Sequence, residues 1–202
     1  MLAIERLASF DKSELEEVSK TLCREDLPKL VEWLADKDDT IRYNAFLLLH
    51  HRSSNFDDVY PFWDVFYEKL KMQNSYQRSL GLMLISDNVK WDKNNKIDSV
   101  IDEYLLHLND EKPITVRQCI QSLTSIVQHK SHLSEKIAER LMGVDIESIK
   151  ETMQKLVLSD ILKVLAVIRR YQTNDDIEDY IVNALSGGRL DKKTTKEIEM
   201  ML

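Results

Sequence analysis

The residues best suited to metal or nucleophilic chemistry are two cysteines and five histidines. His107, His129, His132 and Cys119 are of types that bind zinc. His129 and His132 are only three residues apart near the end of a predicted helix, and no Cys-x-x-Cys or His-Glu-x-x-His sequence accompanies them. A structural zinc site needs four convergent ligands. The sequence therefore predicts no metal site.

Cys119 is also the residue whose type comes nearest to a catalytic nucleophile. It lies in the apolar part of a predicted helix, and no base is adjacent to it in the sequence. A buried free cysteine usually behaves as a small hydrophobic side chain. The chain contains no Gly-x-Ser-x-Gly, Gly-x-x-x-x-Gly-Lys-Ser/Thr or Gly-x-Gly-x-x-Gly motif. We therefore predict no catalytic residue and no cofactor.

A cation recurs near the start of the second helix in four successive predicted hairpins, with separations of 36, 39 and 46 residues. Each cation is followed by a small residue. The pairs are Arg42 with Ala45, Arg78 with Gly81, Arg117 with Cys119 and Lys163 with Ala166. The spacing is three residues in every pair except Arg117 with Cys119, where it is two. This row of cations has two interpretations. It could bind a ligand, or each cation could satisfy turn carbonyls and carboxylates within a helical stack. The structural interpretation is favoured because the row coincides with the repeat itself.

Six aromatic residues gather in one short segment and form a candidate binding surface: Phe56, Tyr60, Phe62, Trp63, Phe66 and Tyr67. Phe62 and Phe66 share a helical stripe with Leu70, which predicts that they are buried. The other stripe contains Tyr60, Trp63 and Tyr67. Tyrosine and tryptophan are frequent anchors of protein interfaces, so we predict these three as partner-binding residues.

The composition predicts that helices position these residues. The chain has 202 residues, of which 4 are Gly and 3 are Pro. Average usage would give roughly 24 in total. Sheet-rich folds need many tight turns, and turns need these residues. With 43% hydrophobic residues the chain can bury a core, so we predict an all-α fold of helices joined by short loops.

The net charge of −7 is distributed unevenly. Residues 1–110 contain 14 Lys plus Arg and 21 Asp plus Glu, a balance of −7, whereas residues 111–202 contain 14 of each. A nucleic-acid binder needs local positive potential. The longest basic runs, Arg169-Arg170 and Lys192-Lys193, have only two residues. We therefore expect another protein as the partner, rather than nucleic acid.

Apolar residues with a period of 3.6 predict a succession of helical hairpins. In the first, Leu27 to Leu34 and Ile41 to Leu49 flank an acidic turn, with Asp26 capping the first helix and Asp39 or Thr40 capping the second. Further helices are predicted at 57–72 and 75–89, 97–108 and 114–128, 134–158 with a break at Gly143 and 160–171, and 177–185 and 194–202. Trp91 and Asp92 predict a corner between repeats, with Asp92 or Asn94 capping the next helix.

Residues 27–55 and 97–133 resemble HEAT repeats in three respects: the length of the helix–turn–helix unit, the Asp-rich turn, and Ile-Arg or Val-Arg at the start of the second helix. The segments 88–98 and 110–120 also resemble small uncharacterised bacterial HEAT-like proteins, some of them labelled as iron–sulfur assembly scaffolds. Cluster ligation usually takes several cysteines, and this chain has two. The resemblance implies an α-α superhelix of about five hairpins, with the second helices on its concave side, which holds another macromolecule.

The expected organisation is one domain over residues 1–202, with capping helices at 1–25 and 173–202 around repeats at 26–172. The expected function is a non-catalytic protein–protein interaction scaffold. Two alternatives from the same fold class are an alkylpurine DNA glycosylase and a lyase-type protein that handles a prosthetic group. The glycosylase needs a basic groove, and the lyase needs a sizeable pocket near a His or Cys.

Several sequence features predict a cytoplasmic protein that does not bind a membrane. Glu5 and Arg6 interrupt any signal-peptide core. No apolar run approaches the roughly 20 residues that span a bilayer. The two cysteines, far apart in the sequence, cannot form a disulfide framework.

Overall fold

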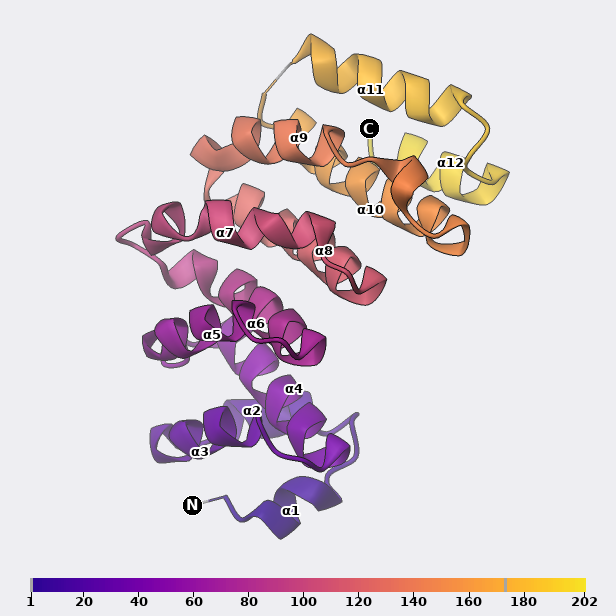
Figure 1. The fold of residues 1–202 in the computed structure, drawn as a ribbon. Coiled ribbons are helices and arrows are strands. Elements are labelled where there is room, and N and C mark those ends of the chain that lie inside the picture. Colours follow the sequence, from indigo (N-terminus) through magenta and orange to yellow (C-terminus); the bar gives the residue numbers. More distant parts are fainter. Residues whose placement is uncertain (1, 173) are drawn as a thin grey trace. The chain divides into compact units, whose positions relative to one another are not determined.

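The computed structural model describes residues 2–172 and 174–202, and in these ranges the chain forms twelve α-helices and no β-strand (Figure 1). Seven short 3-10 helices extend or connect the α-helices. The predicted all-α fold class is confirmed. The shortage of glycine and proline explains it, because few residues interrupt the helical backbone hydrogen bonds.

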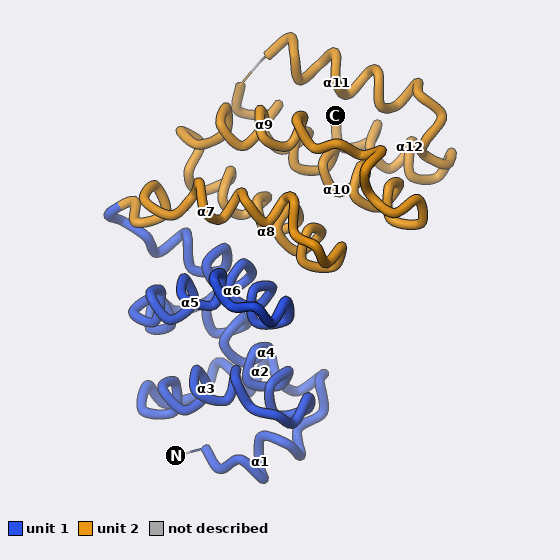
Figure 2. The backbone as a smooth tube through the Cα atoms, in the orientation of Figure 1, with its two compact units in different colours: residues 1–94 blue, residues 95–202 orange. Residues whose placement is uncertain are grey.

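Contacts divide the chain into two compact units, residues 1–94 and residues 95–202 (Figure 2). The single domain with capping helices at both ends stays a prediction. Two of its boundaries fall at residues 1 and 173, which lie outside the described residues.

Unit 1 contains six α-helices. They are α1 (Ile4–Ser9), α2 (Leu15–Thr21), α3 (Leu27–Trp33), α4 (Asp39–Asn55), α5 (Trp63–Leu70) and α6 (Ser75–Asn88), with 3-10 helices η1 (Arg24–Asp26), η2 (Tyr60–Phe62) and η3 (Val89–Trp91). The pairs α3–α4 and α5–α6 are the first two predicted hairpins, and α4 also packs against α1, α2 and α6. The long helix α4 is therefore the centre of this unit.

Unit 2 continues the pattern with six more α-helices. They are α7 (Ile101–Leu106), α8 (Pro113–His129), α9 (Ser134–Met142), α10 (Glu151–Arg169), α11 (Asp175–Ser186) and α12 (Lys192–Glu199), with η4 (Lys96–Ser99), η5 (His107–Asn109), η6 (Ser131–Leu133) and η7 (Ile146–Ser148). Here α8 and α10 lie against each other, and α10 also contacts α9, α11 and α12.

The turns confirm the hairpins but correct the predicted caps. Asp38, not Asp39 or Thr40, caps α4, since its carboxylate accepts hydrogen bonds from the backbone N–H groups of Thr40 at 2.8 Å and Ile41 at 3.2 Å. Asp26 directly precedes α3, yet its carboxylate accepts from the N–H groups of Leu2 and Cys23. An N-terminal segment distant in sequence thus competes successfully for this acceptor.

The predicted helix boundary near Asp160 is wrong. The structure has one uninterrupted helix of 19 residues, α10, and the break before it runs from Gly143 to Lys150. Asp160 lies inside α10, where it pairs with Arg117 of α8. The sequence could not show this, because the partner of Asp160 lies on another helix, 43 residues away.

Close packing inside the hairpins explains the small residue that follows each cation. Ala45, Cys119 and Ala166 are almost completely buried. Gly81 of α6 faces α5 so closely that an added Cβ atom would lie 2.7 Å from the carbonyl oxygen of Phe66 and 3.1 Å from the Cβ of Lys69. The glycine therefore sets the separation of α5 and α6.

The helices α4 and α6 are also joined by a hydrogen bond between His50 and Asp87. The distance between His50 Nδ1 and the Asp87 carboxylate is 2.7 Å. This bond raises the pKa of His50 above its usual value, while burial raises the pKa of Asp87. His51 and Lys90 are the other charged or titratable groups that act on Asp87.

No helix among the described residues is both long enough and apolar enough to cross a membrane.

We expect Gly81→Ala to destabilise the protein by about 1–3 kcal/mol, because the added methyl group would overpack the contact between α5 and α6. The measurement is the free energy of unfolding in urea. Gly143→Ala is the matched control, since its Cβ atom would lie at an ordinary 3.4 Å from the nearest atom. Equal stability of the two variants would contradict the close approach at Gly81.

We expect His50→Asn to destabilise the protein more at pH 6 than at pH 8.5. The folded-state pKa of His50 is raised, so its contribution is fully present below the unfolded pKa of about 6.5 and is lost as the pH rises through the folded pKa. Thermal unfolding of both proteins across this pH range measures the difference. A difference independent of pH would mean that His50 is not held by Asp87.

Candidate functional site

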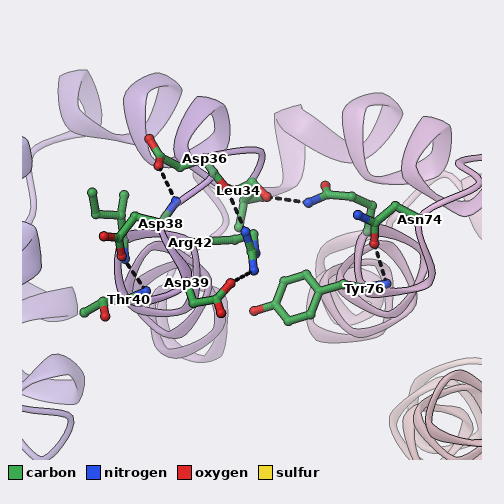
Figure 3. A network of polar contacts seen from close by, with 10 residues as sticks. Leu34, Asp36, Asp38, Asp39, Thr40, Arg42, Asn74 and Tyr76 are labelled. Carbon is green, nitrogen blue, oxygen red and sulfur yellow. Dashed lines mark hydrogen bonds and ion pairs between the residues drawn. The ribbon is translucent and has the colours of Figure 1, made fainter.

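The first two cations of the repeat contact the turns that precede them, as the structural interpretation predicted. Arg42 Nη1 donates to the carbonyl oxygen of Asp36 at 2.7 Å, and its Nη2 pairs with the Asp39 carboxylate (Figure 3). Arg78 Nη1 donates to the carbonyl oxygens of Met72 and Gln73, at 2.9 and 2.6 Å. Both arginines thus satisfy backbone oxygens between a first and a second helix.

The other two cations contact the next helical pair instead. Arg117 Nε donates to the Asp160 carboxylate of α10 at 2.6 Å, and Asp160 also accepts from the amide of Gln121 at 3.1 Å. Lys163 of α10 forms an ion pair of 2.7 Å with Glu197 of α12. The four cations therefore contact different kinds of partner, in two cases their own turn and in two cases another helix.

The three predicted partner-binding residues have different environments. Trp63 is 1% exposed and belongs to the core, so it is not part of a surface. Tyr60 is half-buried, and its hydroxyl donates to Asp92 at 2.8 Å. Tyr67 is half-buried as well, and the ammonium of Lys71 lies 4.0 Å from its ring centre.

A change of helix type explains why Trp63 is buried and Phe62 is not. The sequence predicted one helix over residues 57–72, but the structure has the 3-10 helix η2 up to Phe62 and begins α5 at Trp63. A 3-10 helix turns further per residue than an α-helix. The side chains of η2 are therefore rotated about the helix axis relative to the positions that a continuous α-helix would give them. Phe66 and Leu70 are buried as predicted, whereas Phe62 is half-buried.

Phe62 and Tyr60 line the aromatic pocket, a surface cavity of about 490 Å³ in unit 1. Its further lining residues are Arg24, Leu27, Asp57, Asp58, Pro61, Trp91 and Lys93. Leu27 is 1% exposed and forms an apolar floor. This volume lies within the usual range of ligand pockets.

Internal hydrogen bonds hold the rings of the aromatic pocket in place. The indole N–H of Trp91 donates to the carbonyl oxygen of Ser53 at 2.8 Å. Burial and the hydrogen bond to Asp92 raise the pKa of Tyr60 to about 12, so its hydroxyl stays protonated and continues to donate. Both polar ring atoms are engaged inside the protein, which leaves the ring surfaces for a partner.

The charges at the rim of the aromatic pocket are mixed. Asp58 accepts two hydrogen bonds from Arg52, at 3.1 and 2.7 Å, and lies 3.6 Å from Arg24. Asp57 and Lys93 are exposed. An apolar centre with a polar, exposed rim is typical of protein-binding surfaces.

Of the residues that line the aromatic pocket, the sequence predicted Tyr60 alone for partner binding, and Phe62, Pro61 and Trp91 are among those it missed. The sequence predicts a corner between repeats at Trp91, with Asp92 or Asn94 capping the next helix. Asp92 instead accepts from Tyr60, 32 residues earlier. The signal that could have indicated the pocket is the presence of aromatic residues on both sides of one hairpin, with Tyr60 and Phe62 before α5 and Trp91 after α6.

The histidines and the cysteine considered from the sequence have separate environments in the structure. No cluster of three or more His, Cys, Asp or Glu side chains able to hold a metal occurs among them. His132 contacts Asp98, and His129 contacts the carbonyl oxygen of Ser125. Cys119 is completely buried, and burial raises the pKa of its thiol, so a nucleophilic thiolate is disfavoured.

The comparisons with known proteins concern the fold alone. No known protein family and no curated protein matches the chain. A solved structure described as an engineered protein from the Northeast Structural Genomics Consortium is similar, with a TM-score of 0.54 and 15% identity. The match covers 100% of this chain and 96% of that one.

We expect Arg117→Met to destabilise the protein by about 1–3 kcal/mol, because it leaves the largely buried Asp160 carboxylate without its cation. Lys163→Met is the matched control and should leave the free energy of unfolding unchanged, since its pair with Glu197 is exposed. Urea unfolding of both variants measures this. The reverse order would show that the buried pair does not connect α8 and α10.

Proposed function

We propose that the chain is a non-catalytic, HEAT-like helical-repeat module that binds another protein in the cytoplasm, and that the aromatic pocket is part of its binding surface. The repeated contact of second helices supports the HEAT-like assignment: α4 packs against α6 in unit 1, and α8 against α10 in unit 2. Arg42 and Arg78 contact their preceding turns in the same manner. These regularities are what a repeat of hairpins requires.

The observation that carries the proposal is the aromatic pocket itself. Tyr60 and Trp91 are fixed by internal hydrogen bonds before any partner arrives. A partner side chain that packs on these rings would therefore bind with little additional loss of side-chain entropy. Aromatic residues in such a position are frequent anchors of protein interfaces.

The charge of the chain supports a protein partner with a basic surface. The net charge is −7, and residues 1–110 carry the whole excess of acid. Electrostatic complementarity favours association with a partner of opposite charge and raises the association rate. The same excess of acid disfavours the glycosylase alternative, because phosphate groups would be repelled. The lyase alternative has no support from the aromatic pocket, whose lining contains no His or Cys.

We expect Phe62→Ala to reduce partner binding at least about tenfold, because it removes one wall of the aromatic pocket. Tagged wild-type and variant proteins would be compared by affinity capture from native lysate, followed by titration with the purified partner. Raising the salt concentration should weaken the wild-type interaction.

Tyr171→Ala is the matched control, since Tyr171 is an exposed aromatic residue of unit 2 and does not line the pocket. It should bind as the wild type does, and melting temperatures verify that both variants fold. Unchanged binding by Phe62→Ala would move the site elsewhere. Capture of nucleic acid without protein, stable in moderate salt, would contradict the proposed function.

A further inference from the structure

A second pocket of unit 1 contains Arg42, whose contacts with its own turn leave part of the guanidinium at the wall of a cavity. It is a cavity of about 410 Å³, and the residues that matter here are Lys12, Asp39, Thr40, Arg42, Tyr43 and Tyr76. None of these lines the aromatic pocket. We call it the Arg42 pocket. Its volume lies within the range of small-molecule sites.

Two cations of the Arg42 pocket lie over tyrosine rings. The guanidinium carbon of Arg42 is 4.5 Å from the ring centre of Tyr76, and the ammonium of Lys12 is 4.6 Å from the ring centre of Tyr43. Figure 3 shows Tyr76 directed toward Arg42 and Asp39. Such contacts orient a cation without neutralising it. Each ring therefore holds a positive charge at the wall of the cavity.

Arg42 differs from its repeat equivalent Arg78. Arg78 donates to two turn carbonyls through Nη1, and it does not line the Arg42 pocket. Arg42 donates to a single turn carbonyl, and its acidic partner is the side chain of Asp39, which is 89% exposed. Because this carboxylate reaches into solvent, another anion can take its place. The turn contact of the repeat is thus retained in Arg42 while part of its guanidinium faces the cavity.

Lys12 supplies the charge that remains available. It lies outside the repeated motif, is exposed, and forms no ion pair with a described residue. The lining therefore carries two positive charges against the one negative charge of Asp39. The nearby acids Asp11 and Asp38 direct their carboxylates to the backbone N–H groups of Ser13 and Thr40. These two carboxylates keep their negative charge, so the surplus of one positive charge belongs to the residues that line the pocket.

We propose that the Arg42 pocket binds a carboxylate carried on a small apolar or aromatic body. Lys12 and Arg42 would contact the carboxylate, and the hydroxyl of Thr40 is a further donor at the wall. The rings of Tyr43 and Tyr76 would pack on the apolar body. The surplus of one positive charge matches a monoanion, whereas the excess of acid in residues 1–110 opposes a dianion such as a phosphate monoester.

This ligand could be a free carboxylic acid or an acidic side chain next to an aromatic residue in a peptide. Phenylacetate and N-acetyl-Phe-Asp-amide are the two probes that separate these sources. Each would be titrated into the full chain while amide chemical shifts are followed by NMR. We expect saturable shifts at Lys12, Tyr43 and Tyr76, with a roughly millimolar dissociation constant for phenylacetate. The probe that binds more tightly identifies the source.

Lys12→Met tests the charge, since it retains a stem that can pack on Tyr43 and alters no ion pair. Binding should weaken at least about fivefold. Lys29→Met is the matched control, because Lys29 is also an exposed lysine over an aromatic ring, that of Trp33 at 5.8 Å, and does not line the pocket. This variant should bind as the wild type does.

Three results would overturn the proposal. The first is an absence of saturable shifts with either probe up to about 20 mM, well above the expected dissociation constant. The second is that neutral phenylacetamide binds as tightly as phenylacetate, or that Lys12→Met binds the probes as tightly as the wild type does. Each of these changes removes the contact between the two charges. The third is tighter binding of benzyl phosphate, which would replace the monoanion by a dianion. Each of these results leaves the proposed role of the aromatic pocket unaffected.

Discussion

The close packing of the two helices in each hairpin is the constraint on which the other features of this protein depend. A helical hairpin has one apolar face that it cannot bury alone, so it must be covered by the next hairpin. At α5 and α6 this packing leaves no space for a single methyl group at Gly81. The buried side chains of α4, α6, α8 and α10 follow from the same geometry, because each of these helices is enclosed by neighbours.

The packing also decides what each repeated cation can do. Arg42 and Arg78 stay at their own turns, where unsatisfied carbonyl oxygens need donors. Arg117 lies where a carboxylate of α10 comes within 2.6 Å, so it joins two second helices instead. Equivalent positions in a repeat therefore share a place in the backbone, while the neighbouring helix determines the partner of the side chain.

Both candidate pockets of unit 1 are built from aromatic rings that the protein itself holds in place. In the aromatic pocket, hydrogen bonds from Tyr60 and Trp91 fix the rings. In the Arg42 pocket, cations lie over Tyr43 and Tyr76. Rings that are already fixed lose little entropy on binding.

The sequence by itself determined the all-α class, most of the hairpins and the small residues at the helix contacts, because these depend on composition and on periodicity along one chain segment. It also indicated that the cations satisfy groups within the structure. It could not show that η2 rotates Phe62 outward and Trp63 inward, since one 3-10 turn shifts a stripe without changing any residue. Only the tertiary structure brought Trp91 and Tyr60 to one pocket and Lys12 and Arg42 to another, because the members of each pair lie far apart in the sequence and packing decides their approach.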